Sequence, residues 1–488
     1  MKTRFLALAL AAPFALGALA AACQNTDNAA GVTGVDTSKA ARPSGCKFTI
    51  SPRAEYIDYG EEKPVVSADP KIRWVRLGLG GNVAPGSEGL TDPSTTSAFA
   101  WQTDLETLAS EVTWGTTPDP ATWPQENRVK GSTWKTPPGS LNANGEARMH
   151  EVYVCGLNAE TTYYYRVGGG PAGGEVWSDV HSFTTTPKRT DAKVTIAVAG
   201  DSRGQDGNAW QLLEKRMLAK APTVQVFSGD MINLGPDQGE WEQWLDRAWK
   251  DDAGKLSTLG QLLTLAAHGN HDAHNTLFYG NLVLPQDTTK YPEFAELFYS
   301  MDIGPVHLVV VDDFFLSTSG DETAKAAITG WLDADLAAAN QRRATVPWLV
   351  AVHHHPEFSS SNHGKDKDVL RVRTTLVPIW DKHHLDLSIS GHDHNYERSK
   401  PLTGPSDMPV VRDSDKDGTM YLVCAGAGAD AYSSGQSAFT AQSFSYKAGG
   451  ALGVYGLLTA TASELLIEGH YLTADGSDPV IDTYTLKK

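Results

Sequence analysis

Apolar and aromatic residues alternate with polar ones between about residues 70 and 187, in short segments separated by glycine and proline turns. Alternation with a period of two is typical of strands that bury one face. The clearest segments read SAFAWQTD, SEVTWGTT, ARMHEVYVCGL, TTYYYRVGGG and VWSDVHSFTTT. Strands that recur at short intervals between turns favour an antiparallel sandwich. We therefore predict an all-β sandwich over residues 70–188.

The pattern changes at residue 192, where nearly continuous apolar strands alternate with segments of helical period. The predicted strands read VTIAVAGD, TVQVFSGD, VHLVVVDD, VPWLVAVHHHP and LDLSISGHDH. The predicted helices between them include NAWQLLEKRMLAK, GEWEQWLDRAWKDD and TAKAAITGWLDADLAAAN. Buried strands joined by helical crossovers indicate an α/β sheet covered on both faces. We predict an α/β domain over residues 192–488.

The amino-terminal segment carries two basic residues, an apolar run and small residues before Cys23. This order is typical of a secretory signal peptide, which we place at residues 1–22. The residues before Cys23 resemble a bacterial lipobox, so that lipidation of Cys23 and simple cleavage both stay open. Residues 23–69 are predicted to be a flexible linker. We expect an exported protein, either secreted or held in the cell envelope as a lipoprotein.

Charge and cysteine content narrow the choice of partners. The chain has 488 residues, with 41 Lys and Arg against 58 Asp and Glu, a net charge of −17. Such an acidic chain has no long-range field to attract nucleic acid, and it would meet an anionic membrane only through a lipid on Cys23. A negatively charged substrate must therefore be attracted locally. The four cysteines exclude a disulfide-built scaffold, and their pairing stays open, as does the oligomeric state.

Polar residues with metal-binding atoms follow the predicted strands of the α/β domain. The residues are Asp201, Asp230, Asn270, His271, the histidines of VHHHP, His392 and His394. Because the carboxyl ends of strands in an open α/β sheet lie along one crevice, we expect these side chains to converge. Carboxylate, amide oxygen and imidazole together suit Zn, Mn or Fe. The sequence therefore predicts a metal centre at this edge of the domain.

The motifs GDSRG, GDMIN, GNHD, VHHHP and GHDHNYER stand in an order that resembles the calcineurin-like metallophosphoesterases. Within that superfamily the chain is similar to the purple acid phosphatases, which carry an N-terminal fibronectin III-like or Ig-like sandwich. The resemblance covers roughly residues 70–470. It implies an α/β sandwich of mixed sheets flanked by helices, with two divalent or trivalent metal ions (Fe, Zn or Mn).

The resemblance also implies a role for each donor. Asp201 and His394 would bind the first metal, and Asp230 would bridge both. Asn270 and His392 would bind the second metal, and His354 would be a further ligand. His354 is favoured over its neighbours because the family's ligand lies two residues before the proline of the VHHHP element.

Two positions depart from the family pattern. The purple acid phosphatases place a tyrosine three residues after the bridging aspartate, where this chain has Asn233. Other branches place a ligand histidine two residues after the first aspartate, where this chain has Arg203. Asn233 or water could fill the missing position at the first metal. We therefore expect a similar site without the purple colour.

The resemblance implies phosphomonoester hydrolysis by attack of metal-bound hydroxide on phosphorus. His271 and His363 are the candidates for protonating the leaving group, and Arg203 could grip the phosphate. For His363 an ordinary loop histidine, and for Arg203 a surface salt bridge, remain open. The alternatives for the whole protein are a phosphodiesterase or nucleotidase on the same metals, and an inactive, envelope-anchored binding protein.

Overall fold

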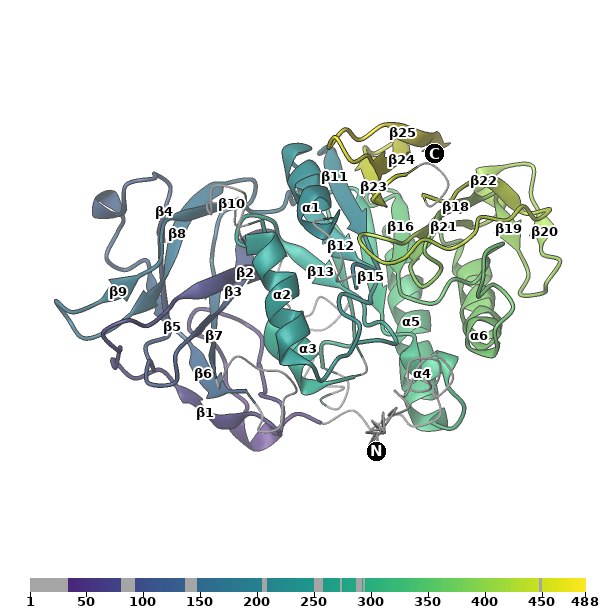
Figure 1. Cartoon of the computed structure of the whole chain (residues 1–488). Coiled ribbons are helices and arrows are strands. Elements are labelled where there is room, and N and C mark those ends of the chain that lie inside the picture. Colours follow the sequence, from purple (N-terminus) through teal and green to yellow (C-terminus); the bar gives the residue numbers. More distant parts are fainter. Residues whose placement is uncertain are drawn as a thin grey trace, which may run out of the picture.

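The computed structural model describes residues 34–79, 93–136, 147–203, 209–249, 258–272, 274–286, 292, 295–446 and 450–488. The predicted signal peptide, Cys23 and the first quarter of the predicted linker lie outside these residues. Two parts follow one another along the chain, a β-sandwich and an α/β sandwich, and they lie side by side (Figure 1). Within the described residues, no helix is both long and apolar enough to cross a membrane.

The β-sandwich consists of two antiparallel sheets with the orders β1-β6-β7-β3-β2 and β10-β8-β4-β5, with β9 paired to β8. The first sheet contains β1 (Ile57–Glu61), β2 (Arg73–Gly78), β3 (Thr96–Thr103), β6 (Ser132–Lys135) and β7 (Arg148–Cys155). The second contains β4 (Glu111–Gly115), β5 (Arg128–Lys130), β8 (Thr162–Gly169), β9 (Val176–Trp177) and β10 (His181–Thr184). Phe99 of one sheet packs its ring 4.7 Å from that of Tyr165 of the other. The predicted sandwich is confirmed.

Residues 34–69 differ from the predicted flexible linker. Strand β1 pairs with β6, and Phe48 and Ile50 are buried against the sandwich. Cys46 forms a disulfide with Cys155 at the end of β7, a separation of 109 residues. The composition of this segment is small and polar, but the disulfide and a few buried apolar residues are enough to fix it. The sandwich therefore begins well before residue 70.

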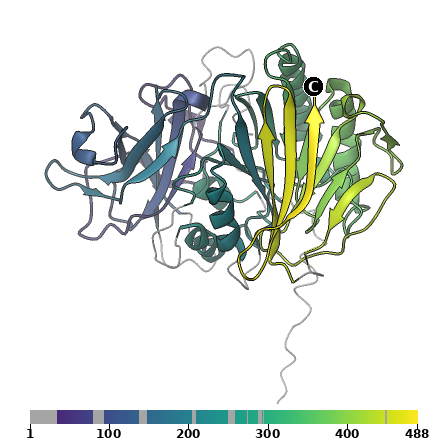
Figure 2. The same ribbon diagram turned by 90° about the horizontal axis from the view of Figure 1, so that it is seen from above.

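The α/β part contains two sheets that face each other (Figure 2). Their orders are β13-β12-β11-β23-β24-β25 and β14-β15-β16-β17-β21-β18-β22. The first sheet contains β11 (Val194–Ala199), β12 (Val224–Phe227), β13 (Thr264–Ala266), β23 (Gly453–Ala460), β24 (Glu464–Leu472) and β25 (Val480–Lys487). The second contains β14 (Phe298–Ile303), β15 (Val306–Val311), β16 (Trp348–Val352), β17 (Leu387–Ser390), β18 (Tyr396–Ser399), β21 (Met420–Cys424) and β22 (Thr440–Phe444). A small hairpin is formed by β19 (Leu402–Thr403) and β20 (Val410–Val411).

Helices cover the outer faces of these sheets. They are α1 (Ala209–Ala219), α2 (Gln238–Trp249), α3 (Thr276–Asn281), α4 (Phe314–Ser317), α5 (Glu322–Asn340) and α6 (Lys367–His383). Trp210 of α1 packs edge-on against Phe227 of β12, and Trp331 of α5 packs against Phe298 of β14. The parallel pairs β11–β12–β13 and β15–β16–β17–β21 place several strand ends at one edge of the molecule. The predicted fold class, mixed sheets flanked by helices, is confirmed.

Candidate metal centre

The predicted donors follow the carboxyl ends of strands from both sheets. Asp201 follows β11 and Asp230 follows β12 in one sheet, whereas His392 follows β17 in the other. These three residues have φ angles of 56°, 57° and 67°, the left-handed region that residues other than glycine rarely adopt. Backbone strain of this kind concentrates at functional sites, where the surrounding structure enforces it. The backbone N–H of His392 donates to the Asp201 carboxylate at 3.1 Å, so that the turns after β11 and β17 meet.

One group of donors surrounds the amide oxygen of Asn270. Oδ1 of Asn270 lies 2.9 Å from Nε2 of His354 and 3.1 Å from Nδ1 of His392. Nε2 of His354 also lies 3.5 Å from Oδ1 of Asp230. Nδ1–H of His354 donates to the backbone oxygen of Ser228 at 2.8 Å, which leaves a lone pair on Nε2 in the neutral ring. Lone pairs that face one another at these distances fit a shared metal ion, which would satisfy all of them.

A second group contains the donors that the resemblance assigns to the first metal. Nε2 of His394 lies 3.4 Å from Oδ1 of Asp201. Nδ1–H of His394 donates to the backbone oxygen of Asp430 at 2.6 Å, so that Nε2 carries the lone pair. The guanidinium of Arg203 lies among these donors. Its Nη2 is 3.3 Å from Nε2 of His394, and its Nη1 is 3.3 Å from Oδ1 of Asn233. A metal fits this group less well, because a fixed positive charge already faces its donors.

Asp230 connects the two groups. The side chain is buried, which by itself opposes ionisation, but His354, His271 and Arg203 outweigh the burial and hold the pKa of this carboxyl below its usual value. Nε of Arg203 lies 3.5 Å from Oδ2 of Asp230. Gly229 precedes Asp230 with a φ of 91°, and a Cβ on this residue would lie only 2.8 Å from Nδ1 of His354. The carboxylate is therefore ionised and held in place by its surroundings.

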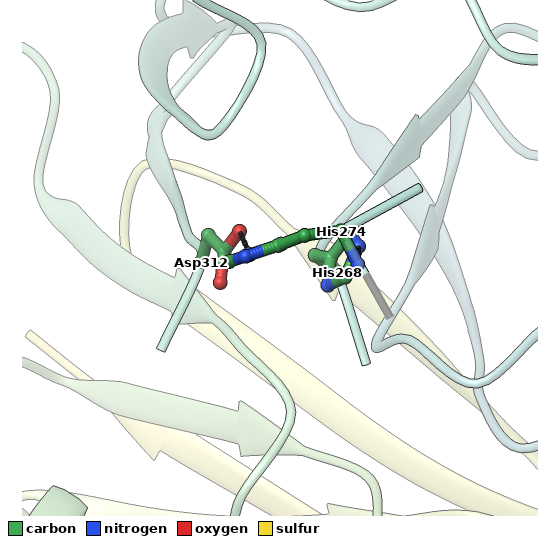
Figure 3. A group of neighbouring side chains, drawn as sticks. All are labelled: His268, His274 and Asp312. Carbon is green, nitrogen blue, oxygen red and sulfur yellow. Dashed lines mark hydrogen bonds and ion pairs between the residues drawn. The ribbon is translucent and has the colours of Figure 1, made fainter. Parts of the chain in front are cut away.

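Further polar side chains hold the turn that carries Asn270. Asp272 accepts hydrogen bonds from the backbone N–H groups of Gly269 and Asp230, each at 2.9 Å, and so joins two strand ends. His268, His274 and Asp312 form a buried group behind this turn (Figure 3). Nε2 of His268 accepts from the backbone N–H of His274 at 2.7 Å, and the His274 ring contacts Asp312. His268 thus holds the backbone at His274, just after the turn that carries Asn270.

Each of the two candidate proton donors is held through one ring nitrogen. The His271 ring donates through Nδ1–H to the backbone oxygen of Asn233 at 2.8 Å. Burial lowers the pKa of His271, and the positive charge of Arg203 also lowers it. The negative charge of Asp230 acts in the opposite direction. The His363 ring donates through Nδ1–H to Asp366 at 2.8 Å, and its centroid lies 4.7 Å from that of His392. In both rings Nε2 is the nitrogen left for a substrate.

Several residues at the centre were not identified from the sequence. The Tyr432 ring stacks on His394 with centroids 4.0 Å apart, and its hydroxyl lies 3.3 Å from Nη2 of Arg203. His353 and His355 both contact Asp313 through Nδ1 at 2.9 Å, and the centroid of the His355 ring lies 4.6 Å from that of His392. Tyr432 and Asp313 lie in segments without a recognisable motif, and only the preference for His354 within VHHHP pointed toward this arrangement.

Comparisons with known proteins agree with this architecture. Residues 89–185 match the family described as purple acid phosphatase, N-terminal domain, and residues 177–396 match the calcineurin-like phosphoesterases. A solved structure of purple acid phosphatase PPD1 from yellow lupin (Lupinus luteus) has a TM-score of 0.63 at 17% identity, over 86% of this chain and 75% of that one. A structure of PhoD has a TM-score of 0.55 at 13% identity, over 84% of this chain and 88% of that one.

Three curated relatives align over part of their length. An uncharacterized protein of Mycobacterium tuberculosis is 29% identical over 43% of this chain and 42% of its own length. Purple acid phosphatase 21 of Arabidopsis thaliana is 25% identical over 58% of each chain. A phosphoenolpyruvate phosphatase of Allium cepa is 25% identical over 62% of this chain and 59% of its own. The chain thus spans less than two thirds of these relatives. Residues 177–396 thus match the calcineurin-like phosphoesterases, and the chain is similar to the purple acid phosphatases.

Proposed function

We propose that the protein is an exported, metal-dependent phosphomonoesterase. The observation that carries the proposal is the contact of Asn270 with His354 and His392, with Asp230 beside them. The named relatives support the choice of monoesters, since they are called purple acid phosphatases and a phosphoenolpyruvate phosphatase. We propose a small phosphoester as the substrate, which would bind to a protein of net negative charge.

A metal ion at these donors would polarise a phosphoryl oxygen and lower the pKa of a coordinated water. Asp230, Asn270, His354 and His392 would hold it, and Fe, Zn and Mn all suit this mixture of oxygen and nitrogen donors. The resemblance implies a second ion at Asp201, Asp230, Asn233 and His394. The contacts of Arg203 change that part of the proposal.

The chain's own residues would bind the phosphate and move the proton. His363 is oriented by its hydrogen bond to Asp366, which leaves Nε2 to protonate the leaving oxygen. His271 is oriented in the same way by the backbone oxygen of Asn233. Arg203 brings a positive charge beside His271, because its Nη1 lies 3.5 Å from Nδ1 of that ring. With a net charge of −17, such local attraction is what a phosphate needs.

Export is supported by two independent features. Residues 1–22 have the order of a signal peptide, and Cys46 is bonded to Cys155. Structural disulfides of this kind form in oxidising compartments outside the cytoplasm. We propose location outside the cytoplasm, with a lipid on Cys23 as the contact with a membrane and with no nucleic-acid partner.

A substrate panel tests the proposal. The full metal-loaded chain should hydrolyse p-nitrophenyl phosphate and alkyl phosphates, and a His392→Ala variant should lose this activity while keeping its circular dichroism spectrum. Turnover of bis(p-nitrophenyl) phosphate without turnover of monoesters would replace the proposal with a phosphodiesterase. Native protein that neither binds metal nor hydrolyses any phosphoester would leave the binding protein as the better reading.

A further inference from the structure

We propose that the guanidinium of Arg203 takes the place of the first metal ion, so that the centre holds one metal ion instead of two. This inference rests on the proposed function and refines it, because it states how many ions the phosphoesterase uses. It concerns the donors that the resemblance assigns to the first metal and leaves the group around Asn270 as the metal site.

The geometry places Arg203 where that ion would be. The three nitrogens of the guanidinium each face a different donor of the first position. Nε lies 3.5 Å from Oδ2 of Asp230, Nη1 lies 3.3 Å from Oδ1 of Asn233, and Nη2 lies 3.3 Å from Nε2 of His394. Oδ2 of Asp230 is buried and makes no hydrogen bond within the described part of the chain. The ion pair with Arg203 therefore provides the positive charge that this oxygen faces.

The charge and the N–H donors of the Arg203 guanidinium allow it to take the place of a metal ion. A guanidinium stays protonated at every accessible pH and has no lone pair, so that it cannot act as a ligand. It presents several N–H donors in a plane, and these match the carboxylate, amide and imidazole acceptors that surround it. A dication placed among the same donors would lie against a fixed positive charge. The two cations are therefore alternatives at this position.

Arg203 and Asn233 both stand where the resembled families supply a ligand to the first metal. Arg203 stands two residues after Asp201, where other branches of the resembled superfamily supply a histidine ligand. Asn233 stands three residues after Asp230, where purple acid phosphatases supply a tyrosine. The first position thus lacks both of these ligands and has gained a cation. The group around Asn270 keeps all of its predicted donors.

The side chain is also built into its surroundings. Its Nη2 lies 3.3 Å from the hydroxyl of Tyr432, whose ring stacks on His394. The Arg203 side chain is 16% exposed, so that one edge of the guanidinium still reaches solvent. Arg203 can therefore stabilise the Asp230 carboxylate and still present a donor to a phosphoryl oxygen. A metal ion at the first position would have served both purposes.

Metal content measured without reference to activity tests the inference. The full chain is stripped with a chelator, reloaded with Zn²⁺, desalted and analysed for zinc per chain. We expect about one ion in the native protein, about two in Arg203→Gly, and one in Arg412→Gly, a matched change at an exposed arginine. Two ions in the native protein would overturn the inference, as would an unchanged single ion in a folded Arg203→Gly variant.

Two histidine variants separate this inference from the proposed function, and they serve if Arg203→Gly fails to fold. His394→Ala should keep the single ion, whereas His392→Ala should lose it. The native protein could instead bind two ions, bind one as His394→Ala, and hydrolyse phosphomonoesters. This result would reject the replacement of a metal ion by Arg203 but not the proposed function. Absence of both metal and hydrolysis in the native protein would reject the proposed function as well. With Mn²⁺ in place of Zn²⁺, the native protein should give the electron paramagnetic resonance signal of an isolated ion and not that of a coupled pair.

Discussion

Oδ1 of Asn270 lies 2.9 Å from Nε2 of His354, although both atoms are hydrogen-bond acceptors when the ring is neutral with its proton on Nδ1. Such a contact is unfavourable without a cation or a proton between the two atoms. Their convergence, from the ends of β13 and β16, therefore marks the position at which the protein is organised to bind a metal.

The first prediction is that Asn270→Ala lowers metal affinity by more than the roughly 10–100-fold that is lost with a residue hydrogen-bonded to a metal ligand. Asn270→Asp should retain the ion, because it keeps an oxygen at the same place. The control is Asn275→Ala, whose side chain accepts from the backbone N–H of Leu277 and caps α3. This change should cost about 1 kcal/mol of stability and leave the metal content unchanged. Equal metal loss in both alanine variants would show that the effect is structural.

The second prediction concerns His363 as the proton donor. Its Nδ1–H is held by Asp366 at 2.8 Å, which leaves Nε2 for the leaving group. His363→Gln should slow hydrolysis of an alkyl phosphate by about 10²–10⁴-fold, because an alkoxide needs a proton to depart. The loss on p-nitrophenyl phosphate should be much smaller, since this leaving group departs without one. A uniform loss on both substrates would contradict the assignment, and His271→Gln, measured in the same way, shows which histidine carries the role.

Local patterns were enough to predict the fold class and the approach of Asn270 to His354 and His392. Strand ends such as those at Asp201 and His392 could be predicted because a continuous apolar run before a polar residue is a local signal. The packing of residues 34–69 could not be predicted, because it depends on the disulfide between Cys46 and Cys155, a contact across 109 residues. The same limit applies to Tyr432, which reaches His394 from a loop without a motif.

The GHDHNYER motif shows how sequence resemblance and physical role can differ. Its last residues do not lie among the donors. Arg398 forms two hydrogen bonds with Asp482 of β25, at 2.6 and 3.1 Å, and the Tyr396 hydroxyl donates to the same carboxylate at 2.9 Å. These contacts connect β18 of one sheet to β25 of the other. The motif therefore combines metal donors with residues that hold the two sheets together.

The third prediction is that the disulfide stabilises the sandwich. Cys46 and Cys155 join the amino-terminal segment to β7 across 109 residues, and closing a loop of this length in the unfolded chain contributes about 2–5 kcal/mol. Cys46→Ser, or reduction of the native protein, should lower the unfolding temperature measured by circular dichroism. The control is addition of reductant to Cys46→Ser, which should cause no further shift, because Cys424 is a buried free thiol and should not respond to reductant. An unchanged transition after verified reduction would contradict the prediction.

The fourth prediction is that the iron-loaded protein has no phenolate charge-transfer band in the visible spectrum. Asn233 stands at the position of the tyrosine that colours the purple acid phosphatases, and its Oδ1 faces Nη1 of Arg203. The Tyr432 hydroxyl lies close to the same guanidinium, so that a coloured sample would have to be tested with Tyr432→Phe. Loss of colour in that variant would assign the phenolate to a residue outside the family pattern.

The fifth prediction concerns pH and stability at a site remote from the metal donors. Burial raises the pKa of Glu214 to about 8, although Gln225 donates a hydrogen bond to this side chain at 2.8 Å. Glu214 therefore keeps its proton in the folded state up to about pH 8, whereas the unfolded chain releases it above its ordinary value of 4.5. Between these values the unfolded state binds fewer protons, so that stability falls as pH rises, by about 1.4 kcal/mol per unit at most.

Glu214→Gln removes this dependence, because the amide keeps the shape of the protonated carboxyl and still accepts from Gln225. From pH 5 to pH 8, the unfolding temperature of Glu214→Gln should rise increasingly above that of the native protein. At pH 7 the variant's gain in free energy of unfolding should be on the order of 2–3 kcal/mol. Glu126→Gln, at an exposed position, should show no such growth. A constant difference across this range would mean that Glu214 is ionised in the folded protein, and its charge would then need a partner other than Gln225.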